Sequence, residues 1–254
     1  MSRVRTHDFA CPGGIAASLA FYPPDTGQGA HSHDYAQFSL LLSGEMLERH
    51  QRREWTPPGA SIGLKPPGLR HENSWGRDGV LIFSLKLRDS GWKELFPTDE
   101  PGWSATGDTY LGPALFGRLA EASDPARRQE TIFDLLALPL VRKERARTSV
   151  PAWLSRARDA IRDEPEVVRV DAAAREAGVH RVRFTALFKA AFGLPPSLYR
   201  HRVMTARAIA RIAGGAGPLT RVAHESGFAD QSHLTRSVAR STGLAPSRLR
   251  ALLA

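Results

Sequence analysis

The sequence predicts a multidomain protein with both α and β structure, in which a β-barrel or β-sandwich is followed by helices and by an all-α domain. Three observations predict this arrangement. The first half contains short β-branched and apolar runs separated by Pro and Gly, the last hundred residues contain a helical repeat, and the positive charge is confined to the C-terminal part. A chain of 254 residues is long enough for two domains.

Charge divides the chain near residue 150. Residues 1–149 carry 18 basic and 18 acidic side chains, whereas residues 150–254 carry 17 basic and 8 acidic ones, so the net charge of +9 lies in the C-terminal part. Binding of nucleic acid to a basic domain releases counterions, so this asymmetry predicts a nucleic-acid partner; a merely solubilising surface is the alternative. The lone Cys11 excludes a disulfide framework, and the absence of a long apolar run at the N-terminus predicts a soluble, cytoplasmic protein without a membrane partner.

The region of residues 1–110 is expected to be an all-β sandwich or small barrel. Runs at 36–42, 60–64 and 80–87 predict strands, because they are rich in β-branched and apolar residues. The expected turns between strands are Ser43-Gly44-Glu45, Pro57-Pro58-Gly59 and Pro66-Pro67-Gly68.

Two further features of this region have more than one interpretation. Charges of alternating sign from Glu45 to Glu54 predict a strand pair and its loop, with a solvated rim as the main interpretation and signalling to the other domain as the alternative. Buried packing is the expected use of the tryptophans, with stacking on a ligand as the alternative. They are Trp55, Trp75, Trp92 and Trp103.

Residues 111–149 are expected to form helices and a linker. Leucines from Leu111 to Leu119 and apolar residues from Ile132 to Leu140 predict two helices with broad apolar faces, interrupted at Asp124-Pro125. The charged run at 142–151 predicts an exposed linker.

The last hundred residues contain an internal repeat. Residues 193–200 match residues 243–250 at Gly, Leu, Pro, Ser and Arg, with an offset of 50. Each copy predicts a short helix, a glycine turn and a longer helix, over about 168–192 and about 218–242. This is the helix-turn-helix pattern, in which the second helix enters the major groove of DNA.

The turn in each copy is expected at a glycine that can adopt positive φ. Gly178 and Gly227 match at an offset of 49, so the second copy has one extra residue after its glycine, and we expect this residue in the turn. Asp230 is the predicted N-cap of the second longer helix.

A continuous helix over residues 196–213 is predicted between the two copies. Tyr199, Val203 and Ile209 have helical spacing, and the glycines from Gly214 onward end the helix. Such a helix would hold two reading units at a fixed distance, which suits major-groove segments about 34 Å apart on one face of DNA.

The second copy contains a series of residues with a specific order and spacing. They are Val222-Ala223, Gly227-Phe228-Ala229-Asp230-Gln231-Ser232, Leu234, Arg236, Gly243, Pro246 and Arg250. Through these residues the chain resembles the AraC/XylS family of transcription regulators over roughly residues 153–252. The resemblance implies a DNA-binding domain over 150–254 that binds specific double-stranded DNA, with RNA polymerase as a candidate further partner.

Two residues depart from the family pattern. His180 replaces the usual Ser before the first reading helix, and Val238 replaces a usual aromatic, which predicts a weaker cap and a smaller core residue.

The same resemblance implies which side chains face the DNA bases. Gln231 suits an adenine edge, Arg236 a guanine, and Val182 a thymine methyl group. For each residue, a contact with phosphate or solvent alone is the alternative. The implied positions are Arg181, Val182, Thr185 and Ala186 in the first unit, and Gln231, Ser232, His233 and Arg236 in the second.

Two blocks of residues stand out in the N-terminal half: His31-Ser32-His33 with Gln37 and Gly44, and residues 66–73. Through these blocks this half resembles the cupins, a family of β-barrels common in front of this DNA-binding domain. In metal-binding cupins the equivalents of His31, His33, Gln37 and His71 converge on one ion, which implies a divalent transition metal. Gln37, however, stands where Glu is usual and supplies no negative charge. We therefore interpret the histidines as lining a small-molecule site, with metal binding as the alternative.

Together the two resemblances imply a transcription regulator rather than an enzyme, in which a small-molecule effector or a metal in the barrel changes the placement of the DNA-binding domain. Helices at 111–149 commonly pair two subunits in this family, which implies a homodimer; packing against the β-barrel of the same chain is the alternative. One rival is a metal-dependent cupin enzyme with a DNA-binding appendage, which a carboxylate at position 37 would favour. Another is an architectural DNA-binding protein, against which the large neutral β domain argues.

Overall fold

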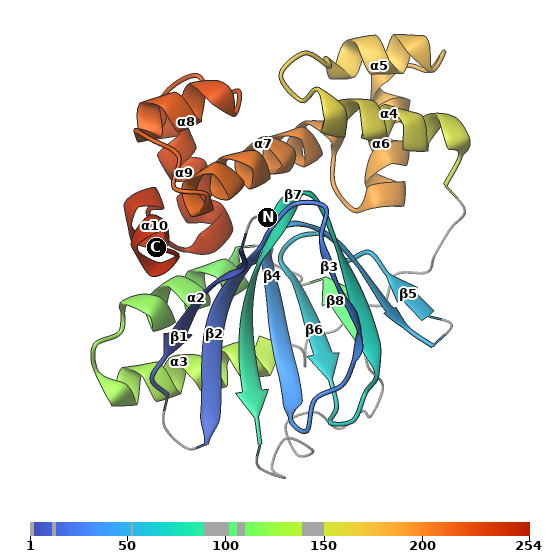
Figure 1. Ribbon diagram of the computed structural model, residues 1–254. Helices are drawn as coiled ribbons and strands as arrows, with labels where there is room; N and C mark the ends of the chain where they lie inside the picture. The colour runs from blue at the N-terminus through green and yellow to red at the C-terminus, as the bar shows by residue number, and fades with distance from the viewer. Residues whose placement is uncertain (1–2, 12–13, 52, 89–101, 106–109, 139–149) are drawn as a thin grey trace.

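The computed structural model describes residues 3–11, 14–51, 53–88, 102–105, 110–138 and 150–254. An antiparallel β domain is covered on one face by two helices, and the C-terminal helices lie across one end of the sheet (Figure 1). This order of β domain, helices and all-α domain confirms the predicted fold class. Within the described ranges, no helix is both long and apolar enough to cross a membrane. Trp92, Leu140 and residues 142–149 of the expected linker lie outside the described residues.

The β domain is one antiparallel sheet with the strand order β1-β2-β7-β4-β6-β8. The long strands β4 and β7 form its centre, and the shorter strands β3 and β5 pair with β7 and β4, respectively. The strands are β1 (Arg5–Phe9), β2 (Ile15–Tyr22), β3 (Gly27–His31), β4 (Ala36–His50), β5 (Arg53–Trp55), β6 (Ser61–Lys65), β7 (His71–Leu87) and β8 (Gly102–Ala105).

Alternation along the strands gives the sheet two chemically different faces. Successive side chains of a strand point to opposite faces, so a strand that alternates between apolar and polar residues separates them. Phe38, Leu40 and Leu42 of β4 join the main hydrophobic core, whereas Gln37 and Ser39 line a polar pocket. In β7 the core residues are Leu81, Phe83 and Leu85, and the pocket residues are Ile82, Ser84 and Lys86.

The expected turn at Ser43-Gly44-Glu45 is wrong. Strand β4 continues through these residues, with irregular register between Leu41 and Ser43 and again after Gly44. A Cβ atom at Gly44 would lie 2.0 Å from the carbonyl oxygen of Gly79, and the φ of Gly44 is +90°. The glycine therefore permits a close approach of two strands rather than a reversal of the chain. The other two expected turns are present between strands.

Helices α2 (Leu111–Glu121) and α3 (Pro125–Ala137) cover the apolar face of the sheet. The interruption at Asp124-Pro125 is confirmed, and the Asp124 carboxylate accepts a hydrogen bond from the Ala126 N–H at 3.1 Å. The apolar faces of both helices pack within this chain, which is the alternative to dimerisation. Phe133, by contrast, is 52% exposed. The buried helix residues are Leu115, Phe116, Leu119, Ile132, Leu135 and Leu136.

The repeat and the helix between its copies are confirmed. The first unit contains α5 (Val170–Glu176) and α6 (Arg181–Phe192), and the second contains α8 (Leu219–Glu225) and α9 (Gln231–Thr242). The extra residue of the second copy lies in its turn, as expected. The intervening helix α7 has the predicted bounds, Pro196–Ala213, while α4 (Ala152–Asp163) and α10 (Pro246–Leu252) flank the two units.

Candidate DNA-binding surface and effector pocket

The second unit presents α9 with a well-formed N-terminus. The Asp230 carboxylate accepts a hydrogen bond from the His233 N–H at 2.7 Å, which confirms the predicted N-cap. Leu234 and Val238 are completely buried, so the smaller residue at 238 is still a core residue. The side chains of Gln231, Ser232 and Arg236 are exposed on the outer side of α9 and are accessible to a DNA duplex.

His233 differs from these three residues because its side chain is half-buried within the unit. Its ring stacks on that of His201, with centroids 5.4 Å apart and an interplanar angle of 19°, and it meets Phe228 edge-on. The pKa of His201 is lowered, mainly by burial and then by the charge of His233, which favours the neutral form of the His201 ring. His233 therefore also positions the start of α9.

The first unit presents a less polar reading surface. Val182 is 70% exposed, Ala186 is also exposed, and Thr185 is half-buried. Arg181 is exposed but forms a salt bridge with Asp171 at 3.0 Å. The expected weaker cap is present, because the His180 ring accepts from the Val182 N–H at a long 3.4 Å.

One further basic residue lies on the same candidate surface of the first unit. Arg183 is exposed on α6 and occupies the repeat position that His233 occupies in α9. The offset of 50 would have identified it, since every residue of α6 has a counterpart in α9 at that spacing.

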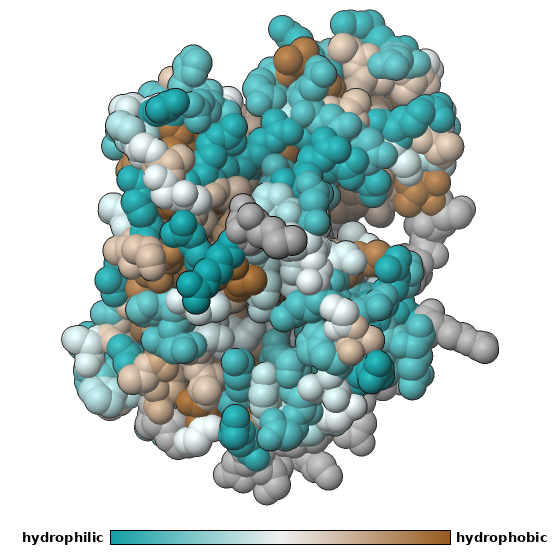
Figure 2. All heavy atoms as spheres, viewed as in Figure 1, coloured by the Kyte–Doolittle hydropathy of each residue, from teal (hydrophilic) through white to brown (hydrophobic). Residues whose placement is uncertain are grey.

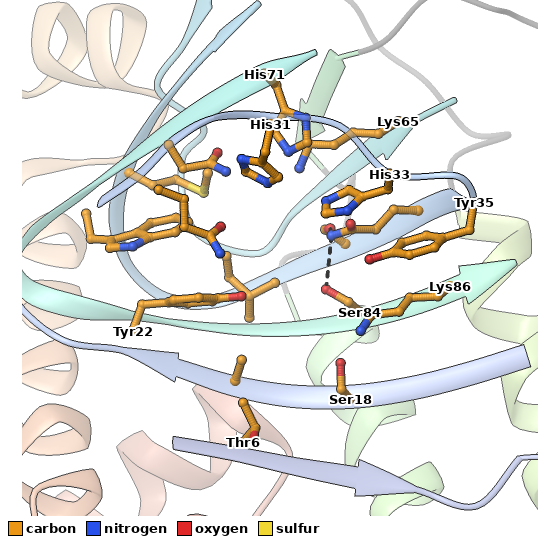
Figure 3. Close-up of a pocket in the computed structure, with 18 of the residues that line it drawn as sticks. Thr6, Ser18, Tyr22, His31, His33, Tyr35, Lys65, His71, Ser84 and Lys86 are labelled. Atoms are coloured by element: carbon orange, nitrogen blue, oxygen red, sulfur yellow. Dashed lines mark hydrogen bonds between the residues drawn. The ribbon is translucent and has the colours of Figure 1, made fainter. Parts of the chain in front are cut away.

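A cavity of about 340 Å³ lies on the polar face of the β sheet. Three histidines converge at its upper side (Figure 3), and their ligand atoms all lie within 4.8 Å of one another. His31 and His71 are paired across strands β3 and β7, and His33 reaches the cluster from the segment after β3. His31 is the last residue of β3 and His33 lies beyond the strand, but both side chains reach the same place.

The hydrogen bonds of the cluster determine which nitrogen atoms are available. The Nδ1 atoms of His31 and His71 lie 2.7 Å and 3.1 Å from the carbonyl oxygens of Gly29 and Leu69. A carbonyl oxygen only accepts, so both Nδ1 atoms carry the proton and both Nε2 atoms keep a free lone pair. Burial, followed by the charge of Lys65, lowers the pKa of His71 to about 3, and burial also lowers that of His33. These neutral imidazoles suit a divalent transition metal.

Gln37 lines the same cavity, but its amide is used within the protein. The amide nitrogen donates to the Ser39 hydroxyl at 2.8 Å and lies 3.4 Å from that of Ser84 (Figure 3). The three histidines form the group of side chains that could hold an ion, and Gln37 would add at most a neutral oxygen. The predicted four-residue set thus reduces to a three-histidine cluster with a nearby amide.

Several pocket residues were missed by sequence reasoning. Lys86 and Tyr35 lie beside the histidines, with the ammonium group 5.7 Å from the centre of the Tyr35 ring. Tyr22 stacks on Trp75, with ring centroids 4.5 Å apart, so Trp75 is both buried and part of the pocket wall. Their alternation with core residues in β2 and β7 is the sequence signal that could have found Tyr22 and Lys86.

A buried ion pair supports the pocket from the side. The Lys65 ammonium lies 2.8 Å from the Glu48 carboxylate, and both side chains are almost completely buried. The interpretation of the segment from Glu45 to Glu54 as a solvated rim is therefore wrong for Glu48. Glu45 also faces the protein, because its carboxylate accepts a hydrogen bond at 2.7 Å from the Tyr199 hydroxyl of α7.

Residues 173–251 match the model of a helix-turn-helix domain family. The C-terminal part of the chain therefore contains a helix-turn-helix domain, and the matched segment includes α6, α9 and the helix α7 between them.

Three solved structures are similar to parts or all of the chain. ToxT from Vibrio cholerae O395, bound to (E)-4-(8-methylnaphthalen-1-yl)but-3-enoic acid, is 11% identical over 99% of both chains, with a TM-score of 0.42. The C-terminal domain of AraT, a response regulator from Geobacillus stearothermophilus, is 16% identical over 41% of this chain and 88% of its own, with a TM-score of 0.38.

The third structure, KdgF from Halomonas sp., is 12% identical over 35% of this chain and 83% of its own, with a TM-score of 0.31. No curated protein matches the chain in sequence.

Proposed function

We propose that the protein is an AraC-type transcription regulator in which the β domain binds a small-molecule effector in the histidine-lined pocket, and that occupancy of this pocket changes the placement of the helix-turn-helix domain on DNA. One observation carries this proposal: the strands that form the pocket wall also contact the helix-turn-helix domain. Met46 and Trp75 line the pocket. Their near neighbours Glu45 and Arg77 contact the other domain, through Tyr199 at 2.7 Å and Asp163 at 2.8 Å.

The chemistry of the pocket favours a polar, oxygen-rich effector with negative charge. Lys86 lines the pocket, and the structure gives it no carboxylate partner among the described residues. The hydroxyls of Ser84, Tyr22 and Tyr35 can donate to oxygen atoms of a ligand. A divalent metal on the three histidines would add a Lewis acid to which such oxygens bind.

The first experiment is elemental analysis of the full-length protein together with binding to its own upstream DNA, with and without a chelator. In His33→Ala, we expect the response to metal or effector to be lost and the intrinsic DNA affinity to be unchanged. The matched control is His50→Ala, because His50 lies in the same domain but does not line the pocket. Loss of folding in His33→Ala would instead show a structural role.

A second variant tests the pocket whatever its ligand. Ser84 lies in the wall of the 340 Å³ cavity, so Ser84→Phe would fill part of the space that an effector needs. We expect a reporter driven by the upstream DNA to lose its regulated response in this variant, while DNA binding persists. Unchanged regulation in Ser84→Phe would contradict the proposed effector site.

For the DNA contacts, we propose the eight predicted side chains of α6 and α9, with Arg236 as the principal base-reading residue. Arg236→Ala should weaken specific binding by about 1 to 3 kcal/mol. Measurement on the upstream duplex and on a scrambled duplex separates two roles. Loss confined to the upstream duplex indicates a base contact, whereas equal loss on both indicates a phosphate contact.

We also propose that the protein forms a homodimer through α3. Phe133 is 52% exposed, unlike the buried apolar residues around it. Phe133→Ser should shift a dimer to monomer in sedimentation experiments, and Gln129→Ser, at an exposed polar position of α3, is the control. A monomeric wild-type protein at all concentrations would contradict this proposal.

A further inference from the structure

A second cavity, of about 440 Å³, lies outside the β pocket, between the N-terminal strands and helix α7. Arg3 and Arg5 line it from the N-terminal side, together with residues of α7. Of the described residues that line this cleft, the proposed function uses Arg77 alone, for its contact with Asp163. Both domains contribute to its charged lining, which consists of Arg3, Arg5, Arg77, Asp78, Arg207 and Arg211.

Arg207 forms the fixed part of the cleft. Its side chain is only 16% exposed and contacts Asp78 at 3.5 Å and Glu166 at 3.1 Å. It also donates to the backbone carbonyls of Arg162 and Asp163, at 2.9 Å and 2.8 Å. These partners already satisfy the guanidinium of Arg207, so this side chain fixes the shape of the cleft. The charges of the other arginines are less fully balanced.

The remaining arginines carry more charge than the lining neutralises. Among the described residues, Arg3 and Arg5 have no carboxylate partner, and Arg5 donates only to the neutral carbonyl of Leu253 at 3.0 Å. Arg77 and Arg211 are paired with carboxylates, but these do not line the cleft, and their own side chains are 49% and 36% exposed. Asp78 is the one carboxylate among the described lining residues. An anion in the cleft would relieve this repulsion.

We propose that this cleft binds a small phosphorylated molecule, with the phosphate on Arg3 and Arg5 and an apolar portion against Phe21 and Pro23. Guanidinium groups form paired hydrogen bonds with phosphate oxygens, and a phosphate monoester carries about −1.5 to −2 charges at neutral pH, more than a carboxylate, which suits several arginines. The volume lies in the range of about 300 to 1,000 Å³ that is typical of ligand pockets. The apolar lining includes Phe21, Pro23, Pro24, Ala210 and Ala213.

Occupancy of this cleft would join the two domains. Arg3 and Arg5 belong to the N-terminal strand region, and Arg211 belongs to α7. A phosphate between them replaces repulsion by attraction to both sides, so the molecule would stabilise the contact between β1 and α7. The cleft is thus a second ligand site that acts on domain placement independently of the histidine pocket.

The test uses full-length protein and phenyl phosphate, which combines the phosphate with a small apolar ring. Calorimetry at constant ionic strength should show saturable binding of one molecule per chain, and neutral phenol should not bind. The double variant Arg3→Gln/Arg5→Gln should lower the affinity at least tenfold. The control Arg53→Gln/Arg127→Gln removes the same charge at exposed positions outside the cleft and should bind normally.

A single substitution keeps the proposal testable if the double variant does not fold. Arg3 is exposed and makes no described ion pair, so Arg3→Gln should fold normally and still lose severalfold in affinity. His33→Ala should bind phenyl phosphate as the wild type does, so failure of this proposal and failure of the histidine-pocket proposal are distinguishable. Unchanged affinity in Arg3→Gln and in the double variant would overturn the proposal.

The phosphates of the DNA backbone have the same chemistry, so a second experiment distinguishes binding of DNA in the cleft from binding of a small phosphorylated molecule. Phenyl phosphate is titrated into protein saturated with the upstream duplex. Retained binding supports a small-molecule site that remains accessible on DNA. Complete displacement by the duplex, with weaker binding of scrambled DNA by Arg3→Gln/Arg5→Gln, would show that the cleft is a DNA contact and that the proposal is wrong.

Discussion

The two helix-turn-helix units share a sequence repeat but differ in what they pack against. The first unit has a hydrophobic core of its own, which includes Leu154, Phe184 and Phe188. In the second unit, Leu234 and Val238 belong to the same core as the sheet and helix α2. Figure 2 shows the units as two lobes separated by a notch. A local motif thus determines its own helices, whereas its neighbours determine whether it is an independent or an integrated folding unit.

Backbone contacts hold the second unit still closer to the β domain. A Cβ atom at Gly243 would lie 2.0 Å from the carbonyl oxygen of Pro113, at the start of α2. The Ser241 hydroxyl donates to the Leu42 carbonyl at 2.9 Å. The first unit meets the β domain through polar contacts such as Arg77–Asp163, which is partly exposed and contributes little. We therefore expect the first unit to be the one that reorients.

The largest effects should come from matched core substitutions in the two units. Phe184 and Leu234 occupy equivalent repeat positions and are both completely buried. Phe184→Ala and Leu234→Ala should each lower the free energy of unfolding, for the region in which the residue packs, by about 2 to 5 kcal/mol. We expect hydrogen exchange to increase only in the first unit for Phe184→Ala, and in the β domain as well for Leu234→Ala.

The outcome decides how far the two cores are separate. Faster hydrogen exchange in the first unit only for Phe184→Ala, and in both the second unit and the β domain for Leu234→Ala, would establish one independent and one integrated unit. If both variants affected only their own unit, the continuous core of the second unit would not act cooperatively with the sheet, and the comparison would fail.

A glycine substitution should have the next largest effect. Gly243 has a φ of +72°, so Gly243→Ala adds backbone strain to the clash with Pro113. Gly178, with a φ of +66°, has no atom within 4 Å of an added Cβ, which makes Gly178→Ala the strain-only control. In urea unfolding, we expect Gly178→Ala to lower the free energy of unfolding by about 1 to 2 kcal/mol and Gly243→Ala to lower it by clearly more. Equal losses would mean that α2 and the end of α9 separate easily.

The sequence predicted most of the helical domain, because its signals are local. The glycine turns, the Asp230 cap and the bounds of α7 depend on residues within a few positions of one another. The different packing of the two units was not predictable, since it depends on contacts between residues far apart in the chain, such as Gly243 and Pro113.

The β domain was predicted less completely. Strands β1, β2 and β8 were missed, and Gly44 was interpreted as a turn, although its function is a close approach to Gly79. The histidine cluster was predicted as a set by resemblance, but its geometry depends on the pairing of β3 with β7. The arginine cleft had no sequence signal, because Arg3 and Arg211 approach each other only in the folded chain.

The smallest effect is expected at the hydrogen bond between the two domains. Burial and the neighbouring Glu45 raise the pKa of Tyr199 above its ordinary value, so its hydroxyl remains a donor. Tyr199→Phe removes only this donor and should lower the free energy of unfolding by about 1 kcal/mol, because Glu45 is half-buried. Tyr22→Phe is the control, since it removes the hydroxyl of a tyrosine that lines the histidine pocket. Faster exchange of the first unit in Tyr199→Phe alone would mean that this bond restrains that unit, whereas equal exchange in both variants would assign the restraint to α7 packing instead.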